Sequence, residues 1–309
     1  MPWLGHDLVM AKTSIDLRAA LRVPPGGDTF DLGAVDPRAT PGLPDSRVVR
    51  QNPKGWARAD TAAVVTELDG YQERLYASAK HGMDGRRVLL VLQAMDCGGK
   101  DGTIKHIVGA LNPQGVQIAN FGPPSEEERR HHFLWRIRRA LPNPGYVGVF
   151  NRSHYEDVLV VRVHGLVSRR VWQVRYGQIN KFERGLVDAG YALLKVMLHI
   201  SPEEQLARLL ARLDDPEKHW KYNPGDVDER GRWADYMAAY GDALGRCSTE
   251  EAPWYVVPAD RKWYRDWAVA HLLRDTFADL RPTYPAVEFD PAAERARLHA
   301  ASSRIPQAA

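Results

Sequence analysis

The stretch that decides the fold is VLLVLQAMDCGGKDGTIKHIVGAL, residues 88–111. Its first half is an apolar run typical of a buried strand, and its second half has the apolar spacing of a helix. Between the two halves, Gly98, Gly99 and Gly102 surround Lys100. A glycine-rich turn before a helix presents backbone N–H groups to an anion, and a lysine there adds a mobile positive charge. The stretch therefore predicts a phosphate-binding loop.

This loop departs from the usual pattern G-x-x-x-x-G-K-[S/T] at two positions. Ala94 replaces the first glycine, and Asp101 replaces the serine or threonine. A second carboxylate, Asp96, lies inside the loop, and phosphates would repel it unless a Mg²⁺ ion lay between them. Asp96 is therefore predicted to bind a metal ion or to orient an incoming phosphate. The alternative is a plain turn in which both aspartates cap the helix.

Outside this stretch, strand-like and helix-like segments alternate along the chain. The predicted strands are 88–93, 115–120, 146–150, 192–200 and 253–257. The predicted helices are 58–81, 103–111, 125–140, 169–189, 202–213, 231–244 and 262–279. Several strand runs are almost entirely apolar, as in a parallel sheet that is covered on both faces. The alternation predicts a doubly wound α/β fold with helices on both faces of a parallel sheet.

Three regions are predicted from composition. Residues 1–57 are rich in proline and glycine, which indicates an extended N-terminal arm. Residues 58–285 form the core, with a lid at about 208–233, and residues 286–309 are expected to be a weakly ordered tail.

The composition limits the class of protein. The 309 residues carry a formal net charge of +3, with 44% hydrophobic and 26% charged residues. So small a net charge suits a local polyanion site better than a surface that coats nucleic acid. The two cysteines provide neither a disulfide framework nor a metal cluster. Because no apolar run approaches the ~18 residues of a membrane span and no signal-peptide pattern is present, we expect a cytoplasmic protein that binds no membrane.

A second group of polar residues follows the predicted strand 146–150. It contains Asn151, Arg152, Glu156 and Asp157. Arg152 is predicted to point into the same crevice as the loop lysine, where its forked guanidinium can bind two phosphoryl oxygens. The two acids offer Mg²⁺ ligands or contacts to a ribose or base. For Asp157, a role as a ligand and a role as a helix cap both remain open.

The segment 208–233 combines a helix with a basic stretch that prolines interrupt. Arg208 and Arg212 lie four residues apart on one helical face, and Lys218 and Lys221 follow. This pattern is typical of a lid that closes over phosphates and excludes water. The alternative is a solvated loop, because acidic and basic residues are equal in number there.

Four motifs together resemble the polyphosphate kinase 2 family in order and spacing. They are LQAMDCGGKDGTIKH (92–106), VFNRSHYEDVLVVRVHG (149–165), DDPEKHWKYNPGD (214–226) and PWYVVPADRKWYR (253–265). With TFDLGAVDPRATPG (29–42), the resemblance covers roughly residues 22–280. It implies a P-loop kinase fold like that of thymidylate kinase, a three-layer sandwich with a helical lid. In this family the loop reads G-x-D-x-x-G-K-D-G, so both loop aspartates belong to the pattern and Ala94 is the one departure.

The resemblance also implies an activity: Mg²⁺-dependent transfer of the terminal phosphoryl group of inorganic polyphosphate to a nucleotide, reversibly. Carried over by position, the resemblance assigns catalysis to Asp96, Lys100 and Arg152, and the metal ion to Asp96 and Asp157. The phosphate loop would consist of Cys97, Gly98, Gly99, Lys100, Asp101 and Gly102. The nucleotide would be bound by Asn151, Glu156 and Asp157, and the polyphosphate by the lid residues Arg208, Arg212, Lys218 and Lys221. The acids in NRSHYED resemble the subgroup that accepts both AMP and ADP.

Further expectations follow from the family. The cofactor is Mg²⁺, or Mn²⁺ in its place, the nucleotides carry adenine or guanine, and the chain forms a homodimer or homotetramer. Two rival functions remain: a nucleotide or nucleoside kinase that uses ATP as the donor, and a non-catalytic module that binds polyphosphate or nucleotides.

Overall fold

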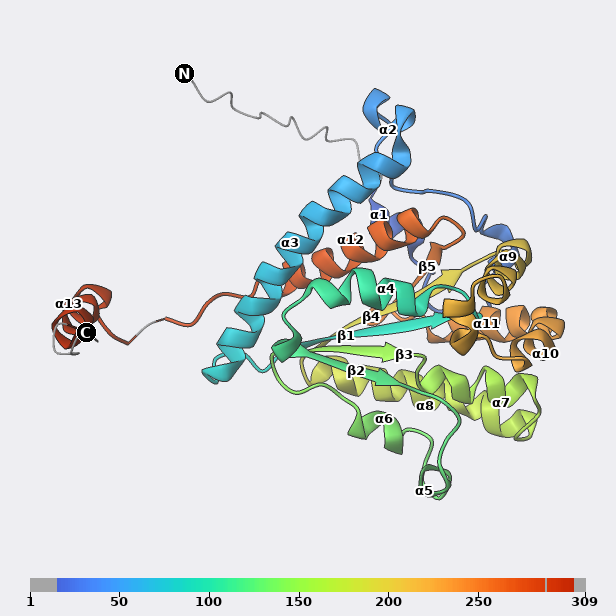
Figure 1. Ribbon diagram of the computed structural model, residues 1–309. Helices are drawn as coiled ribbons and strands as arrows, with labels where there is room; N and C mark the ends of the chain where they lie inside the picture. Colours follow the sequence, from blue (N-terminus) through green and yellow to red (C-terminus); the bar gives the residue numbers. More distant parts are fainter. Residues whose placement is uncertain (1–15, 287, 303–309) are drawn as a thin grey trace.

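A computed structural model describes residues 16–286 and 288–302. Its described part contains one sheet of five parallel strands: β1 (Arg87–Ala94), β2 (Val116–Asn120), β3 (Val147–Asn151), β4 (Tyr191–His199) and β5 (Trp254–Pro258). Each predicted strand is confirmed to within one residue at both ends. The strand order is β2-β3-β1-β4-β5 (Figure 1). The chain passes from the central β1 to the edge strand β2, returns to β3 and then crosses to β4 on the other side of β1. In such sheets ligands bind beyond the carboxyl ends of the strands at this reversal.

Helices cover both faces of the sheet, as the sequence predicted. On one face lie α3 (Pro53–Lys80), α4 (Lys100–His106) and α12 (Lys262–Leu280), and on the other lie α7 (Val160–Val163), α8 (Arg169–Asp188) and α11 (Trp233–Cys247) (Figure 1). Alternate side chains of β1 explain the two layers: Leu90 packs in the first core and Leu89 in the second. Both leucines are fully buried, which is why this strand is apolar throughout.

One helix prediction was wrong. The region 125–140 is not a single helix, because α5 (Glu126–Arg129) ends after one turn and α6 (Trp135–Arg139) begins separately. A capping box at Ser125 starts α5, but no residue of that helix is buried. A short helix without an apolar face to pack is not sustained. The predicted helix 103–111 begins earlier, at Lys100, and its last residues form the 3-10 turn η2 (Val108–Ala110).

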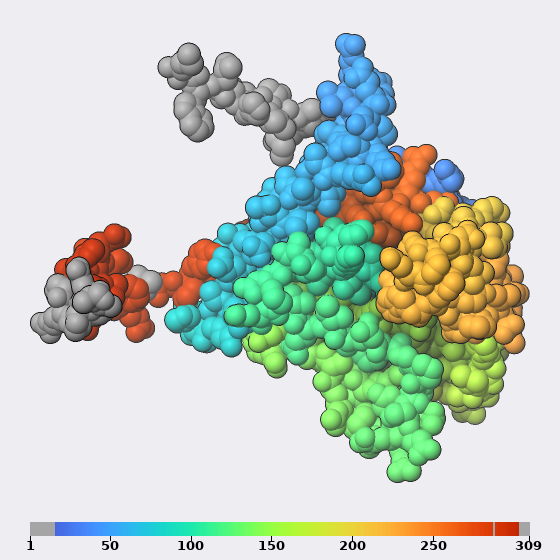
Figure 2. Space-filling model, viewed as in Figure 1, coloured from blue at the N-terminus to red at the C-terminus, as the bar shows by residue number. Residues whose placement is uncertain are grey.

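The segment predicted as a lid, 208–233, begins inside α9 (Pro202–Leu213) and continues through the 3-10 helix η5 (Pro216–Lys221) and α10 (Gly225–Gly231). We call residues 202–232, from the start of α9 to the residue before α11, the lid. It leaves the core after β4 and rejoins it at the start of α11. Figure 2 shows it as a gold block beside the green segment that carries α4. The lid therefore lies at the carboxyl edge of the sheet, next to the glycine loop.

The described part of the N-terminal arm contains the short elements α1 (Leu17–Leu21), η1 (Leu32–Ala34) and α2 (Arg47–Gln51). An isolated bridge joins Arg22 to Tyr255, so the arm lies along the outer edge of β5. After α12 the chain leads to α13 (Pro291–Ser302), which has no buried residue and lies away from the body (Figure 1). Within the described ranges, none of the helices has the length and apolar character needed to cross a bilayer.

Candidate active site

The glycine loop connects the end of β1 to the start of α4. Cys97 and Gly99 both adopt positive φ, at 61° and 108°, and bend the chain so that α4 starts at Lys100. The Lys100 side chain folds back over the loop, and its Nζ donates to the carbonyl of Ala94 at 3.0 Å. Burial lowers the pKa of Lys100, and the nearby positive charge of Arg152 adds to that effect. A buried ammonium beside the N-terminus of a helix is an arrangement suited to phosphate.

Arg152 and Asp96 meet in front of this loop. Arg152 follows β3 with a positive φ of 60°, and its Nη2 donates to Oδ1 of Asp96 at 2.8 Å. A bulky residue with positive φ is strained by about 1–3 kcal/mol, and such strain concentrates at functional sites. The two strand ends that the sequence analysis singled out therefore lie together.

Asn151 precedes Arg152 at the end of β3, and Glu156 lies in the 3-10 turn that follows Arg152. The Asn151 amide donates to Asp101 at 2.9 Å and to Asn120 at 3.0 Å, which fixes α4 to the neighbouring strand ends. Burial raises the pKa of Glu156, although the charges of Arg152 and Lys100 oppose the shift. Glu156 thus lies among the cations of the site.

Asp157 lies beside two arginine side chains. Its Oδ1 accepts from Nη1 of Arg175 at 3.2 Å, and its Oδ2 lies 3.8 Å from Nη2 of Arg136. A divalent cation at this carboxylate would face two guanidinium groups at close range. Asp157 therefore pairs with two arginines, whereas Asp96 and Asp226 each pair with one. The role of metal ligand stays a prediction for Asp157, and its contacts favour the orientation of the two arginines.

The four predicted lid cations fall into two groups. Arg208 is buried and donates to the carbonyls of Cys97 at 2.8 Å and Ala259 at 2.6 Å, so it joins the loop to the end of β5. Arg212 donates to the carbonyl of Lys221 at 2.9 Å. By contrast, within the part of the chain that the structure describes, the ammonium group of Lys218 contacts the neighbouring Asp215 and that of Lys221 lies over the ring of Trp220. Arg208 thus holds the glycine loop against the end of β5, whereas the ammonium groups of the two lysines can reach a ligand.

Two cavities meet at the Asp96–Arg152 pair. The loop–lid cavity, of about 900 Å³, is lined by the glycine loop together with Arg208, Arg212, Lys218, Lys221, Lys262 and Arg265. The flap cavity, of about 810 Å³, is lined by the region of α5, η4 (His154–Asp157) and α7, with Phe121, Phe133, Val160 and Leu166 among its apolar residues. Asp96 and Arg152 line both cavities. One cavity is therefore rich in cations, the other can hold an aromatic ring, and the two join at a carboxylate and a guanidinium.

Asp226 is a site residue that the sequence analysis counted only as one of the lid acids. It is 7% exposed and lines both cavities. Burial raises the pKa of Asp226, and the negative charge of Asp96 raises it further. The signal was present, since Asp226 is the last residue of the motif DDPEKHWKYNPGD. What the sequence alone lacked was the fold of the lid that brings this residue opposite Asp96.

The two carboxylates fit a magnesium ion that arrives with its phosphates. Among the residues that the structure describes, no group of three or more acidic, histidine or cysteine side chains could hold a metal by itself. Mg²⁺ is commonly bound by one or two carboxylates, with substrate phosphates and water as the other ligands. Asp96 and Asp226 supply that number at the junction of the cavities.

Arg265 is a second residue that the sequence analysis missed. It lies on α12, is 2% exposed, and pairs with its neighbour Asp266 through Nε and Nη2. A Cβ at Gly99 would come within 2.1 Å of the remaining nitrogen, Nη1. The glycine loop therefore rests directly on a buried cation that lines the loop–lid cavity.

We expect Gly99→Ala to lower turnover at least about tenfold while the protein still folds. The substitution combines a strained positive φ, worth about 1–3 kcal/mol, with a methyl group that collides with Arg265. The loop must then shift away from the geometry that cradles phosphate. Steady-state kinetics and a melting curve measure the two effects. Gly85→Ala is the matched control, because nothing lies within 4 Å of its Cβ position. Equal turnover in both variants would contradict the prediction.

Comparisons with known proteins agree with this geometry. The chain matches the family model described as Polyphosphate kinase 2 (PPK2) over residues 53–283. It is 47% identical over 267 residues to the AMP/ADP-polyphosphate phosphotransferase of Meiothermus ruber, covering 86% of this chain and 95% of that one. It is 43% identical over 233 residues to the ADP-polyphosphate phosphotransferase of Rhodopseudomonas palustris, covering 72% and 79%.

A solved structure gives the same result for the fold. The crystal structure of Polyphosphate Kinase 2 from Arthrobacter aurescens TC1 superimposes with a TM-score of 0.86 at 48% identity, covering 93% of this chain and 98% of that chain. The P-loop kinase fold expected from the sequence is thereby confirmed.

Proposed function

The chain belongs to the polyphosphate kinase 2 family, and we propose on that basis that it transfers the terminal phosphoryl group of inorganic polyphosphate to AMP and to ADP. It is an enzyme of the phosphotransferase class. The observation that carries the proposal is the junction of the two cavities at Asp96 and Arg152. A polyanionic donor fits the cation-lined loop–lid cavity, and a nucleotide base fits the flap cavity. Their phosphates then meet at the junction.

The mechanism is positioning and charge neutralisation. An acceptor phosphate oxygen attacks the terminal phosphorus of the donor in line, and the bond to the next bridging oxygen breaks. The acceptor is already an anion at neutral pH, so no strong general base is needed. Lys100 and Arg152 neutralise oxygens of the transferring group, which is where oriented cations lower a barrier most. Asp96 and Asp226 would hold the Mg²⁺, which supplies further charge neutralisation when bound.

The choice of acceptor is the finer part of the proposal. The names of the relatives give different acceptors. The Meiothermus ruber protein is named for AMP and ADP, and the Rhodopseudomonas palustris protein for ADP. A relative from Pseudomonas aeruginosa, which is 33% identical to this chain, is named for GDP. The first of these has the highest identity of the three, which supports AMP and ADP for this chain. Guanine nucleotides are the second candidates.

A nucleotide separation assay tests the proposal. Purified protein, Mg²⁺ and long-chain polyphosphate are mixed with AMP alone and, in parallel, with ADP alone. We expect ATP from ADP, and ADP followed by ATP from AMP. Product from ADP alone would remove the AMP part. No product from polyphosphate, but product from ATP with AMP, would replace the proposal with an ATP-dependent kinase. Binding without any product would favour the non-catalytic module.

Two further properties belong to the proposal. The family expectation of a homodimer or homotetramer is checked by size-exclusion chromatography with light scattering. A cytoplasmic location suits the substrates and the two cysteines, Cys97 and Cys247, which are both free thiols.

A further inference from the structure

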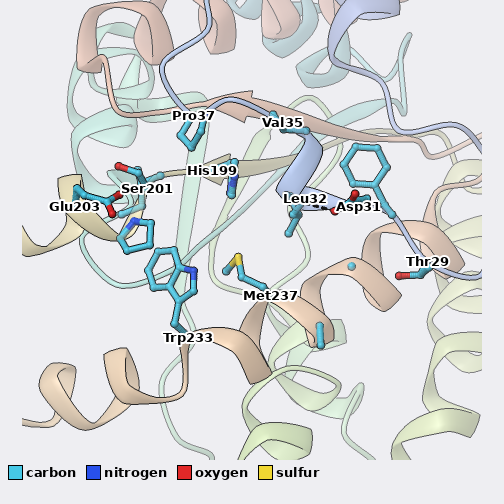
Figure 3. A pocket seen from close by; sticks show the side chains of 16 residues that line it. Thr29, Asp31, Leu32, Val35, Pro37, His199, Ser201, Glu203, Trp233 and Met237 are labelled. Carbon is cyan, nitrogen blue, oxygen red and sulfur yellow. Dashed lines mark hydrogen bonds between the residues drawn. The ribbon is translucent and has the colours of Figure 1, made fainter.

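A third cavity, of about 760 Å³, lies at the base of the lid (Figure 3). We call it the hinge cavity. Its walls are the arm segment 29–37, the segment 199–203 at the end of β4 and the start of α9, and residues 233–241 of α11. The lid leaves the core at Ser201 and returns at Trp233, so both junctions of the lid face this cavity. It shares no lining residue with the two phosphate cavities.

The charge of the hinge cavity is opposite to that of the loop–lid cavity. Its lining contains the carboxylates Asp31 and Glu203 and no lysine or arginine. A phosphate or a nucleotide would meet two negative charges there and no compensating cation. The remaining lining is mainly apolar and aromatic, with Phe30, Trp233 and Met237. Carboxylates beside aromatic faces are suited to an organic cation. The volume falls within the range of about 300–1,000 Å³ that is usual for small-molecule sites.

His199 adds a ring nitrogen that lacks a partner within the described ranges. The residue is 6% exposed, and its Nδ1 makes no hydrogen bond with any residue that the structure describes. Figure 3 shows the ring among the side chains that surround the cavity, between Pro37 above and Met237 below. Burial lowers the pKa of His199, and the charge of Asp260 and the backbone of Val35 only oppose that shift. A neutral imidazole has one nitrogen that accepts a hydrogen bond. Because buried polar atoms without partners are rare, Nδ1 is an acceptor available to a ligand that donates an N–H group, and the ring has to turn to reach such a ligand because the atom itself is buried.

We propose that the hinge cavity binds a small organic cation, an ammonium group carried on a planar aromatic body, and that its occupancy changes the equilibrium position of the lid. The aromatic body packs against Trp233 and Met237, and the ammonium group lies near Glu203 and His199. A molecule held between Pro202 and Trp233 contacts both junctions of the lid. It therefore has different contacts in the open and closed positions, which is the condition for shifting an equilibrium between them. The effect on the lid rests on the proposed function, whereas the binding does not.

Three indole compounds test the binding on the full-length chain. Tryptamine carries the ammonium group, indole-3-acetamide is neutral, and indole-3-acetate is an anion on the same ring. Titration calorimetry, repeated with saturating AMP, measures each affinity. We expect tryptamine to bind at least about tenfold more tightly than the other two, with AMP leaving its affinity unchanged. Equal affinity for all three, displacement by AMP or no binding of tryptamine would overturn the proposal.

Two variants locate the site. Glu203→Gln removes one carboxylate of the hinge cavity and is expected to weaken tryptamine binding several-fold. Glu67→Gln is the matched control, because Glu67 is an exposed acid on α3. Met237→Trp should fill the cavity and abolish binding. Unchanged binding in both Glu203→Gln and Met237→Trp would place tryptamine elsewhere and overturn the assignment.

The effect on the lid has its own readout. Tryptamine is expected to change the KM for polyphosphate at least about twofold in the wild type and in Glu67→Gln, but not in Met237→Trp. If tryptamine binds but does not change the KM for polyphosphate, the proposed effect on the lid is overturned, while the proposed binding site still holds. A failure of phosphotransfer itself would appear as inactivity without tryptamine, with the calorimetric result unaffected.

Discussion

Asp96→Asn is expected to lower turnover by at least about 10²–10³-fold, the scale of one oriented electrostatic group, while the melting temperature stays close to that of the wild type. The substitution preserves the size of the side chain and the acceptor oxygen that Arg152 contacts at 2.8 Å. It also preserves the backbone carbonyl of residue 96, which accepts from Gln205 at 2.9 Å. What it removes is the negative charge at the junction of the two cavities.

The loss of that charge is expected to weaken the binding of Mg²⁺. With asparagine at position 96, Asp226 would be the one carboxylate left among the described residues that line both cavities. We therefore expect the residual activity to require a higher Mg²⁺ concentration, and chelation with EDTA to abolish it. Rates at several Mg²⁺ concentrations measure this, and Asp69→Asn, at an exposed acid on α3, serves as the control. Near-normal turnover at low Mg²⁺ in a protein that melts normally would show that Asp96 has neither proposed role.

Much of this molecule could be predicted from local sequence. Four of the five described strands were found because each is an apolar run that is buried along most of its length, and β1 illustrates this with alternate side chains packed into both cores. The edge strand β2 is only partly buried. The loop was found because its glycines, lysine and aspartates are adjacent in the chain. The prediction of one helix over 125–140 failed because helical residues such as Glu126–Arg129 do not persist without an apolar face.

The contacts that could not be predicted join distant parts of the chain. Arg265 lies under Gly99, although 166 residues separate them in the sequence. Asp226 has to be folded across with the lid before it faces Asp96. Similarly, the sequence left Asp157 open as a ligand or a helix cap, whereas the structure pairs it with Arg175 and Arg136. In each case the role depends on a partner that no local pattern identifies.

A buried charged network lies behind the site, and it too joins distant segments. Lys195 of β4 is 0% exposed and Glu183 of α8 is 1% exposed. Nζ of Lys195 donates to Glu183 at 2.6 Å, to the carbonyl of Cys247 at 2.6 Å and to the hydroxyl of Tyr155 at 3.1 Å. Glu183 also accepts from the Tyr155 hydroxyl at 2.8 Å and shares a hydrogen bond with His154 at 3.1 Å. The network thus fixes the turn that follows Arg152.

Glu183→Gln is expected to destabilise the protein by about 3–5 kcal/mol, because it leaves the ammonium group of Lys195 buried without a counter-charge. For a chain of 309 residues, an unfolding entropy of about 2.1 cal/mol/K per residue makes this a fall in melting temperature of roughly 5–8 °C. The double variant Glu183→Gln/Lys195→Met should recover a large part of the loss, since it removes both charges. Thermal and urea unfolding measure the free energies. A single variant within about 1 kcal/mol of the wild type would contradict the uncompensated-charge argument.

The same network predicts a dependence on pH. Burial alone would raise the pKa of Glu183, but the charge of Lys195 and the hydrogen bonds with His154 and Lys195 outweigh it, so the folded pKa lies below the ordinary value. A carboxylate with a lowered folded pKa contributes stability above its unfolded pKa of about 4.3, and that contribution disappears as the pH falls through the folded value. The double variant should therefore lose less stability than the wild type below about pH 4.3. His154 and Tyr155 belong to the turn between Arg152 and Glu156, so the network also positions the acceptor side of the site. The turnover that the folded double variant loses at neutral pH measures the size of this positioning effect.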